Sequence, residues 1–538
     1  MTTPDTGRPL SHWAWGYADR FPDRAAREAL AQQLTLFLGL EHLPVREPVA
    51  LENAHLPSPR VPVPAVLADI CTEAPAARAQ RCYGRSFPDM LRGFLGDFAA
   101  APDLVCLPRT EAEVVDALRW AQAAGVAVVP YGGGTSVVRG VECDGAGFTG
   151  VMCLDMRGLH RVLSVDRASL SACIQAGATG PVLEAQLAEH GLTLRHYPQS
   201  FEFSTLGGWI ATRAGGHFAT LYTHIDDLVQ AVRMVTPAGV WQSRRLPGSG
   251  AGPDPDRLVL GSEGAFGVIT EAWMRVRPRP VFRSSVTLSF PDLMAAADAA
   301  RRVVQAGLHP SNCRVLDPRE ARLHAVSFDG DALLLLGFES ADHPQVPLLE
   351  EALRVGRDAG GTIKDGPRHR EGERDRGGAA GSWRQAFIDT PYLFGALVSL
   401  DLVADTFETA CTWDRFPDLH EAVVKATRGA MKAACGKGLL TTRFTHVYPD
   451  GPAPYYTFIA PGRPGERAAQ WAAIKAAATE AILAGGGTIT HHHAVGRTHR
   501  AGYAKERPQP MGAVLRAVKH QLDPAGILNP GVLFDGEG

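Results

Sequence analysis

Three consecutive histidines and a glycine-rich loop are the parts of this 538-residue sequence whose residue types could do chemistry. The histidines, His491, His492 and His493, stand in the stretch THHHAVGR near the end of the chain. Imidazole titrates near neutral pH, so it can take up and return protons, and it also binds transition metals. Acid–base catalysis, metal binding and an ordinary strand with solvated imidazoles are the three interpretations.

The spacing of the histidines disfavours a metal site. On a strand, His491 and His493 would face one way and His492 the other, so three successive imidazoles do not easily reach one tetrahedral ion. No HExxH motif and no acidic companion lies nearby at ligand spacing. We therefore expect no bound metal.

The glycine-rich loop, PYGGGTSV at 130–137, follows an expected buried strand, VAVVP. Three glycines in a row let successive backbone N–H groups turn toward one anion, such as a pyrophosphate. The loop is neither a Walker A motif nor the dinucleotide motif GxGxxG. Two further glycine-rich stretches follow, FEFSTLGGWIATRAGG at 201–216 and GSEGAFGVIT at 261–270. One such loop is usually a turn, but three in order predict a backbone that wraps around a dinucleotide.

The elements around these loops alternate between helix and strand. Thr110 and Glu113 form a capping box before a helix whose apolar residues Val114, Leu118 and Ala121 recur at helical spacing. Short strands and helices continue to about residue 280, and a weaker α+β region runs to about 485.

Two regions have a different character. The first hundred residues are expected to be mostly helical, with a proline-rich connector at 56–67. Residues 366–381 are polar and glycine-rich and are expected to form a mobile loop. The fold class is therefore α+β with more than one domain, because 538 residues exceed what one hydrophobic core usually organises.

Composition limits the partners. The 54 basic and 57 acidic side chains nearly balance, so no global field attracts nucleic acid. The sequence shows neither a secretory leader nor an apolar run of transmembrane length, so we expect a cytoplasmic protein. Nine cysteines without CxxC spacing suit a reducing compartment and argue against disulfides.

The order of the three glycine-rich motifs resembles that of the flavoproteins with the vanillyl-alcohol-oxidase (PCMH-type) FAD fold. Within them the chain most resembles the alkyldihydroxyacetonephosphate synthase (alkylglycerone-phosphate synthase) family. The resemblance covers nearly the whole chain and includes these stretches: WAWGYADR, RVLDP, DTFETACTWDR, GPAPYYTF, THHHAVGR and VKHQLDPAGILNPG.

The resemblance implies a domain arrangement. A PCMH-type FAD-binding domain of two subdomains is expected over residues 98–280, and an α+β cap domain that binds substrate over 281–489. A helical N-terminal region would occupy 1–97, and a C-terminal segment with helices, 490–538, would return to the flavin.

The resemblance also implies the FAD-binding residues. The first loop would hold the pyrophosphate, the second stretch the adenosine and isoalloxazine, and the third would pass along the ring. These residues are Pro130, Tyr131, Gly132, Gly133, Gly134, Thr135, Ser136, Gln199, Ser200, Ser204, Thr205, Gly208, Thr212, Arg213, Ala214, Gly215, Glu263, Gly264, Gly267, Val268 and Ile269. No residue matches a covalent attachment motif, so FAD is expected to bind without a covalent bond.

By the same resemblance, the histidine triplet lines the active site, with His492 as the main base and His491 and His493 beside it. Tyr455 matches the catalytic tyrosine of the family, and its phenol could donate a proton or hydrogen bond to a leaving carboxylate. Its neighbour Tyr456 would point away if the segment is a strand.

Three further positions concern substrate anions. Arg443, counted with the catalytic residues, and Arg314 match family arginines near the substrate cavity, where a guanidinium can bind an anion. Phe394 is a departure, because related sequences usually carry an arginine there. Its loss would leave a buried carboxylate or phosphate unpaired, so either Arg443 or Arg314 compensates or the substrate differs.

The expected activity is that of a flavin-dependent transferase of ether-lipid type, in which flavin N5 takes part in exchanging an acyl for an alkyl group with no net redox change. The alternative is an oxidoreductase that oxidises an alcohol or 2-hydroxy acid, since one fold hosts several chemistries. A third possibility, a metal-dependent hydrolase or a non-catalytic flavin-binding module, uses the histidines as ligands. We expect a small, lipid-like substrate, peripheral membrane contact and, from the resemblance, a homodimer.

Overall fold

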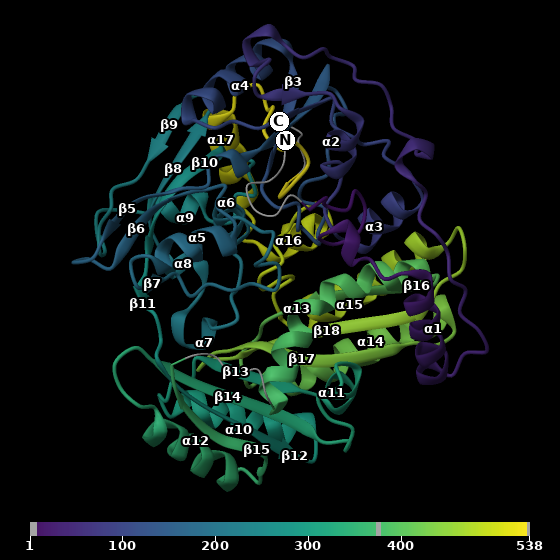
Figure 1. Ribbon diagram of the computed structural model, residues 1–538, viewed down its shortest axis with the longest axis vertical. Coiled ribbons are helices and arrows are strands. Elements are labelled where there is room, and N and C mark those ends of the chain that lie inside the picture. Colours follow the sequence, from purple (N-terminus) through teal and green to yellow (C-terminus); the bar gives the residue numbers. More distant parts are fainter. Residues whose placement is uncertain (1–7, 373–377, 535–538) are drawn as a thin grey trace.

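A computed structural model of the chain describes residues 8–372 and 378–534, with side chains at 8–372 and 389–534. Two small sheets and their helices form the upper half of the molecule in Figure 1, and one large sheet with its helices forms the lower half. No helix in these ranges is long and apolar enough to cross a membrane. The molecule is a mixed helix and sheet structure, as the sequence predicts.

The first small sheet carries the glycine loop at the end of a buried strand. Its strand order is β1-β2-β4-β3, with β1 Cys71–Thr72, β2 Leu104–Cys106, β4 Gly150–Asp155 and β3 Val126–Tyr131. Helix α4, Glu111–Ala124, covers it and begins at the predicted capping box of Thr110 and Glu113. The C-terminal segment returns here, because Asn529 N–H donates to the Val128 carbonyl at 2.8 Å.

The second small sheet carries the other two glycine-rich stretches. Its order is β5-β6-β10-β8-β9, with β5 Val162–Asp166, β6 Ser171–Gln175, β10 Val268–Arg275, β8 Val229–Thr236 and β9 Gly239–Gln242. Five short helices accompany it: α5 Gly180–Ala188, α6 Leu206–Thr212, α7 Ala219–Tyr222, α8 Ile225–Leu228 and α9 Pro255–Val259. A two-stranded ribbon, β11 Arg277–Pro278 with β7 Leu192–Thr193, leads to the lower half.

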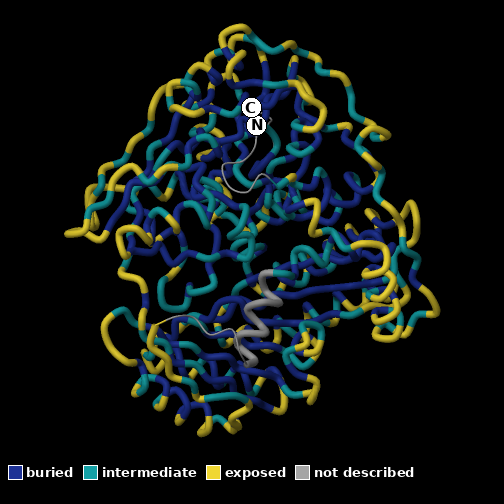
Figure 2. The backbone as a smooth tube through the Cα atoms, viewed as in Figure 1, coloured by how far each residue is buried: buried dark blue, intermediate teal, exposed yellow. Residues whose placement is uncertain are grey.

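The lower half is built on a seven-stranded antiparallel sheet. Its order is β15-β12-β14-β13-β17-β18-β16, with β15 Thr362–Glu371, β12 Phe282–Phe290, β14 Ala332–Ser340, β13 Asn312–Leu316, β17 Leu439–Val447, β18 Pro452–Pro461 and β16 Leu402–Glu408. The helices of this half are α10 Leu293–Gln305, α11 Pro318–Leu323, α12 Val346–Asp358, α13 Gly378–Ser399, α14 Phe416–Cys435 and α15 Arg467–Ala484. The strands of this sheet are mostly buried, except the edge strand β15, which is largely exposed (Figure 2).

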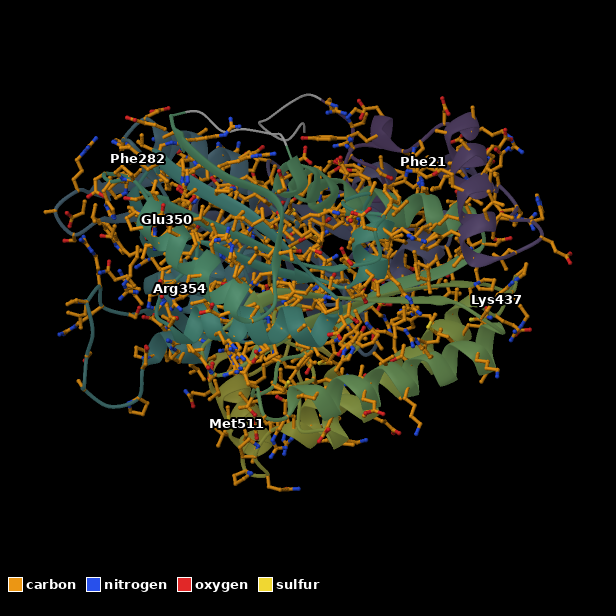
Figure 3. The ribbon with its side chains drawn as sticks, turned by 90° about the horizontal axis from the view of Figure 1, so that it is seen from below. Phe21, Phe282, Glu350, Arg354, Lys437 and Met511 are labelled. Carbon is orange, nitrogen blue, oxygen red and sulfur yellow. A yellow bond between two sulfur atoms is a disulfide. The ribbon has the colours of Figure 1, made fainter. Side chains whose placement is uncertain are left out.

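The two ends of the chain tie the halves together. Helix α1, Arg24–Leu38, packs on the lower half, and Lys437 donates to the Gly39 carbonyl at its end; Figure 3 shows Phe21 and Lys437 on this side of the molecule. Helices α2, Pro75–Gln80, and α3, Phe87–Phe94, lie in the N-terminal region. Helices α16, Arg500–Glu506, and α17, Met511–Leu522, follow the histidine triplet back to the upper half (Figure 1).

Two sequence expectations are wrong. Cys71 and Cys106 face each other in the β1–β2 pairing and form a disulfide, because antiparallel pairing brings their Cα atoms to 4.0 Å. The expected loop at 366–381 is also wrong in part: residues 366–371 extend β15 along β12, and 378–381 begin α13, while 373–377 lie outside the described residues.

Candidate active site

A cavity of about 250 Å³ is lined by all three glycine-rich stretches and by side chains from the large sheet. The glycine loop comes directly after β3, and Gly134 adopts φ +65°, which favours glycine. Among the described residues, none accepts a hydrogen bond from the N–H groups of Gly133, Gly134, Thr135 or Ser136. Four successive donors are thus available to a ligand in the cavity.

The three stretches touch one another because glycine lacks a side chain. A Cβ on Gly133 would fall on the Phe203 carbonyl oxygen, and one on Gly132 would fall on the Thr205 hydroxyl. A Cβ on Gly264 would lie 2.9 Å from the ring of Pro130. Any larger residue would push the second and third stretches away from the first, so the sequence pattern sets the shape of the cavity.

Most of the predicted cofactor residues line this cavity. Those that do are Pro130, Tyr131, Gly132, Gly133, Gly134, Thr135, Ser136, Gln199, Ser200, Ser204, Thr205, Gly208, Thr212, Ala214, Gly215, Glu263, Gly264, Gly267, Val268 and Ile269. Arg213 does not, because its side chain is 61% exposed and pairs with Asp226 at 2.6 Å. It ends α6 instead, in a left-handed conformation.

The residues present fit a bound FAD. The unpaired N–H groups of the first loop suit a pyrophosphate. Arg85 is the only Arg or Lys among the described residues that lines the cavity, and it also borders the smaller hollow behind Gly133 and Thr135. The hydroxyls of Thr205 and Thr212 and the carboxyl of Glu263 are polar groups in an otherwise largely apolar wall, as expected for a flat aromatic ring with polar edges.

Glu263 fastens the C-terminal segment to the third stretch. Its carboxyl oxygens accept the N–H groups of Val495 at 2.9 Å and Gly496 at 2.8 Å. Burial raises the pKa of Glu263 to about 7. Because these two bonds end the turn that carries the histidines, Glu263 couples the cofactor cavity to the triplet.

Replacing Glu263 by glutamine tests this coupling. One amide NH₂ would then face a backbone N–H, so we expect the variant to lose about 1–3 kcal/mol of unfolding free energy and to bind FAD more weakly. Chemical denaturation and a fluorescence titration with FAD measure the two effects. Glu506→Gln is the matched control, because its carboxylate also accepts a backbone N–H, from Ile489, but lies away from the cavity. Equal losses in both variants would contradict the coupling.

The histidine triplet does not form a strand with side chains that alternate between two faces. It forms a turn around Glu408. The N–H groups of His491, His492 and His493 all donate to Glu408 Oε1, at 2.8, 2.9 and 3.0 Å, and the Thr490 hydroxyl donates at 2.7 Å. Glu408 ends β16 and is 2% exposed. One buried carboxylate therefore sets the positions of all three imidazoles.

The electrostatics of this turn favour an ionised Glu408 beside neutral His491 and His493. Burial alone would raise the pKa of Glu408, but His492 and His493 hold that pKa well below its usual value. Burial lowers the pKa of His493 to about 3 and moves the pKa of His491 well below its ordinary value. His492 Nδ1 lies 2.9 Å from Glu408 Oε2. This pairing directs the other nitrogen, Nε2, to act as a base.

Tyr455 and two of the histidines share one wall of the cavity. Tyr455, on β18, lines it together with His492 and His493, and the ring centroids lie 6.1 and 5.3 Å from that of the tyrosine. The phenol donates to Thr406 Oγ1 at 2.9 Å, and burial raises its pKa to about 12, so it stays protonated at neutral pH. Tyr456 points the other way, into the core.

The two predicted arginines do not line the cavity. Arg443 pairs with Glu320 at 2.7 Å, and its guanidinium lies 4.1 Å from the ring centroid of Tyr455. Arg314 donates to the His217 carbonyl at 3.0 Å, and burial lowers its pKa to about 9. Phe394, on α13, does line the cavity. Arg443 thus contacts the cavity wall through the ring of Tyr455.

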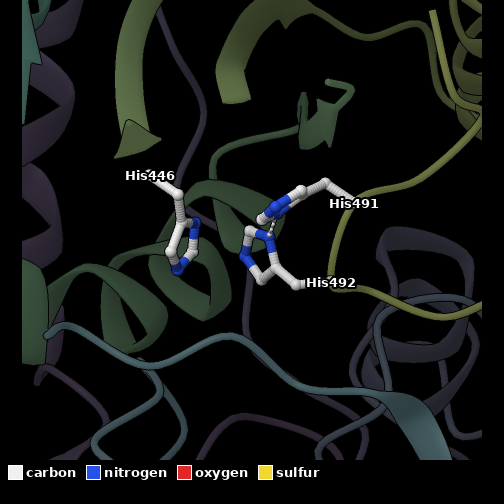
Figure 4. A group of neighbouring side chains, drawn as sticks. All are labelled: His446, His491 and His492. Atoms are coloured by element: carbon white, nitrogen blue, oxygen red, sulfur yellow. Dashed lines mark hydrogen bonds between the residues drawn. The ribbon is translucent and has the colours of Figure 1, made fainter. Parts of the chain in front are cut away.

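His446, on β17, completes a cluster with His491 and His492 that could be read as a metal site, since one ring nitrogen from each lies within 4.8 Å of the others (Figure 4). Tetrahedral zinc needs ligand nitrogens about 3.3 Å apart. His446 already bonds Thr445 Oγ1 at 3.0 Å and the Gly216 carbonyl at 3.1 Å. An ion would have to displace these bonds and draw the rings together, so the observed arrangement is one of hydrogen-bonded imidazoles.

Sequence reasoning missed several residues of the site: Arg85, Glu408, His446, Tyr448 and His224. Glu408 stands 83 residues before His491, so no local spacing links them. Glu408 lies in DTFETACTWDR, which carried part of the resemblance, and an acidic residue among apolar ones on a strand is a usable signal of a buried carboxylate.

Buried neutral imidazoles predict acid sensitivity. Burial lowers the pKa of His224 and His420 to about 4, and that of His196, His493 and His499 to about 3. Since an unfolded histidine titrates near pH 6.5, their contribution to stability is complete above that pH and is lost as the pH falls toward the folded values. We expect the free energy of unfolding to drop by at least about 3 kcal/mol between pH 7 and pH 4, measured by urea denaturation.

Glu263 and Asp317 affect the free energy of unfolding in the opposite direction, because burial raises the pKa of each to about 7. These two carboxyl groups offset only part of the effect of the five histidines. In the His196→Leu variant the slope should be shallower, because His196 is 1% exposed and the leucine has no proton to bind. An unfolding free energy that stays constant from pH 7 to pH 5 would contradict buried neutral imidazoles.

Comparisons with known proteins agree with the conclusion that the cavity binds FAD. Two family models match the chain: one described as "FAD binding domain" matches residues 102–243, and one described as "FAD linked oxidases, C-terminal domain" matches residues 279–533. The residues of the second match include the seven-stranded sheet and the histidine turn.

Relatives and solved structures are similar over most of the chain. Alkyldihydroxyacetonephosphate synthase of Dictyostelium discoideum is 32% identical over 476 residues, 84% of this chain and 77% of that protein. A solved structure of alkyldihydroxyacetonephosphate synthase has a TM-score of 0.81 at 26% identity and covers 97% of this chain and 98% of its own. The mitochondrial D-lactate dehydrogenase (cytochrome) of Arabidopsis thaliana is 33% identical over 228 residues, 42% of this chain and 39% of that protein.

Proposed function

The chain belongs to the alkyldihydroxyacetonephosphate synthase family of FAD-linked enzymes, and we propose that it replaces the acyl group of an acylated dihydroxyacetone phosphate with an alkyl group from a long-chain alcohol. The observation that carries the proposal is the shared wall of Tyr455 and His492 over a cavity built for a dinucleotide. A phenol that stays protonated can serve as the acid when the fatty acid leaves. An imidazole held by the Glu408 carboxylate can serve as the base that removes a carbon-bound proton.

The roles of the residues follow from their contacts. The bound flavin supplies an electrophilic ring atom that takes up electron density from the substrate. Nε2 of His492 removes the proton from the carbon that carries the acyl ester, while Glu408 stabilises the imidazolium that forms. The Tyr455 phenol, whose ring lies against the Arg443 guanidinium, turns its O–H from Thr406 Oγ1 to the leaving carboxylate and donates its proton to it. The incoming alcohol gives its proton to the Tyr455 oxygen as it adds to the carbon, and the His492 imidazolium returns a proton to that carbon, so both side chains regain their starting states.

The apolar part of the cavity supports a substrate with a hydrocarbon chain. Trp15, Met90, Pro391 and Phe394 line it, and burying a methylene group contributes about 0.8 kcal/mol. We therefore assign Phe394 to the chain-binding wall, where an arginine would be costly to desolvate. Phe394→Arg is accordingly expected to raise the KM for a long-chain alcohol more than that for a short one.

Tyr455→Phe tests the acid. Loss of the phenol proton should lower kcat by about 10²-fold with FAD content unchanged, because the ring and its stacking on Arg443 remain. Steady-state assay of fatty acid release measures this. Tyr456→Phe is the matched control, since Tyr456 faces the core, and a loss in Tyr456→Phe as large as in Tyr455→Phe would contradict the assignment.

The experiment that tests the function itself is an anaerobic incubation of the FAD-loaded protein with an acylated dihydroxyacetone phosphate and hexadecanol. Equal amounts of fatty acid and ether product are expected, with no oxygen consumed when air is admitted. Oxidation of a 2-hydroxy acid or alcohol is the second candidate, favoured by the similarity to D-lactate dehydrogenase. Bleaching of the flavin by such a substrate, without ether formation, would replace the first proposal by the second.

We also propose that FAD binds without a covalent bond, that the protein is cytoplasmic and touches membranes peripherally and, from the family alone, that it is a homodimer. Release of FAD on denaturation tests the first point, cell fractionation tests the location and the membrane contact, and the mass in solution tests the homodimer.

A further inference from the structure

A continuous row of hydrogen-bonded side chains leads away from the proposed base. His492 Nδ1 lies 3.0 Å from His491 Nδ1, the dashed contact in Figure 4. His491 Nε2 lies 2.8 Å from the Tyr448 hydroxyl, and that hydroxyl lies 2.7 Å from His224 Nε2. Four side chains from three separate parts of the sequence are thus joined by one nitrogen–nitrogen contact and two nitrogen–oxygen contacts.

The two ends of this row lie in different surroundings. His492 lines the cofactor cavity, and Tyr448 instead lines a separate, open groove of about 700 Å³ that also contains Thr488 and Glu506. His224 is only partly buried. The row therefore leads from the cofactor cavity, past a tyrosine of the surface groove, to an imidazole of intermediate exposure.

We propose that Tyr448 and His224 form a proton relay, through which the proton removed by His492 reaches the solvent. The proposal rests on the proposed function, because it gives His492 the role of the base. Tyr448 and His224 do not line the cofactor cavity, so in the relay they act through His491 and His492.

Each transfer in the relay is balanced. His492 Nε2 takes the proton from the substrate carbon, and the electron pair of that C–H bond remains with the carbon. The Nδ1 proton of His492, which is shared between Glu408 Oε2 at 2.9 Å and His491 Nδ1 at 3.0 Å, moves to His491 Nδ1. The Nε2 proton of His491 then moves to the Tyr448 oxygen, and the phenol proton of Tyr448 moves to His224 Nε2. His224 gives one proton to water. One proton enters and one leaves, and the reverse sequence restores the starting tautomers.

The surroundings of His224 and His491 keep these two imidazoles neutral. Burial lowers the pKa of His224 to about 4, with Arg213 and His492 acting in the same direction and Asp226 against it. Burial, with His224, His492 and His493, lowers the pKa of His491 against the effect of Glu408. A neutral imidazole has one donor and one acceptor nitrogen, which each step needs.

Tyr448 remains a neutral phenol at physiological pH. Burial raises its pKa, as do the neighbouring carboxylates Glu408, Asp226 and Asp450, while Arg314 acts in the opposite direction. A phenol that keeps its proton can donate to one imidazole while it accepts from the other.

Tyr448→Phe removes only the bridging oxygen. We expect kcat to fall about tenfold or more with KM unchanged, and the solvent isotope effect on kcat to rise, because proton exit becomes rate-limiting. Tyr503→Phe is the matched control and should retain the parent kcat. His224→Ala should lose activity similarly and regain it on addition of imidazole, whereas His343→Ala, at an exposed position, should show neither effect.

The ¹⁵N NMR spectrum of protein with labelled histidines gives a test that does not depend on activity. In this spectrum, Tyr448→Phe should shift the signals of His224 and His491. Unchanged kcat in Tyr448→Phe, or unmoved ¹⁵N signals, would overturn the relay and leave the proposed function intact. A parent protein that makes no ether overturns the proposed function, and the variants are then compared on the hydroxy acid that it oxidises. One tightly bound transition metal per chain, whose removal abolishes activity, would also overturn the relay.

Discussion

Replacing His492 by alanine is expected to lower kcat by about 10²- to 10⁴-fold, the range for loss of a general base. His492 is the imidazole that both lines the cavity and pairs with the buried carboxylate of Glu408 at 2.9 Å. FAD should remain bound, because the unpaired N–H groups that suit its pyrophosphate lie in the glycine loop. Steady-state kinetics and the visible spectrum of the purified variant measure the two properties together.

The control for this prediction is His343→Ala, a change of the same type at an exposed position far from the turn. It should leave both kcat and flavin content unchanged. Turnover in His492→Ala within threefold of the parent would rule out His492 as the base, whichever substrate class the protein uses.

The second large effect is expected for Glu408→Ala. The change removes the acceptor of three backbone N–H groups and of the Thr490 hydroxyl. Each buried donor left without a partner costs about 1–3 kcal/mol, so we expect a loss of roughly 3 kcal/mol or more in unfolding free energy. Activity should fall at least as far as in His492→Ala, since the turn that positions all three rings is lost. Chemical denaturation and kcat measure these effects.

Glu408→Gln separates geometry from charge. The amide oxygen can still accept the backbone N–H groups, but the negative charge beside His492 is gone. We expect most of the stability to return and kcat to stay low. If Glu408→Gln were as active as the parent, the carboxylate would serve only to shape the turn.

Much of the upper half could be predicted from the sequence because its signals are local. The capping box of Thr110 and Glu113 begins α4 as expected. The sequence argument is that glycine, which lacks a Cβ, lets backbone approach closely. The structure shows this at Gly133 and Gly264, which each lie against a neighbouring stretch that a Cβ would displace.

The parts that failed depend on contacts between distant residues. A strand is one of the interpretations that the sequence leaves open for the histidine triplet. The triplet forms a turn instead because Glu408, on β16, accepts three of its N–H groups, and no alternation within the triplet reveals that. The Cys71–Cys106 disulfide depends on the β1–β2 register, which the cysteine spacing does not encode.

The arginines show why a residue type alone does not assign a substrate contact. Arg443 and Arg314 are buried and directed at Glu320 and the His217 carbonyl, although both stand where the resemblance puts substrate anions. Their roles toward substrate stay predictions. Arg85, which does line the cavity, has no local motif that sets it apart from the many other arginines of the chain.

Transfer of labelled oxygen tests the central claim most directly. When the FAD-loaded protein turns over an acylated dihydroxyacetone phosphate with ¹⁸O-labelled hexadecanol, group exchange at the Tyr455–His492 wall predicts that the ether retains ¹⁸O and that the released fatty acid contains none. An ether without the label, or no ether and a reduced flavin, would contradict the account.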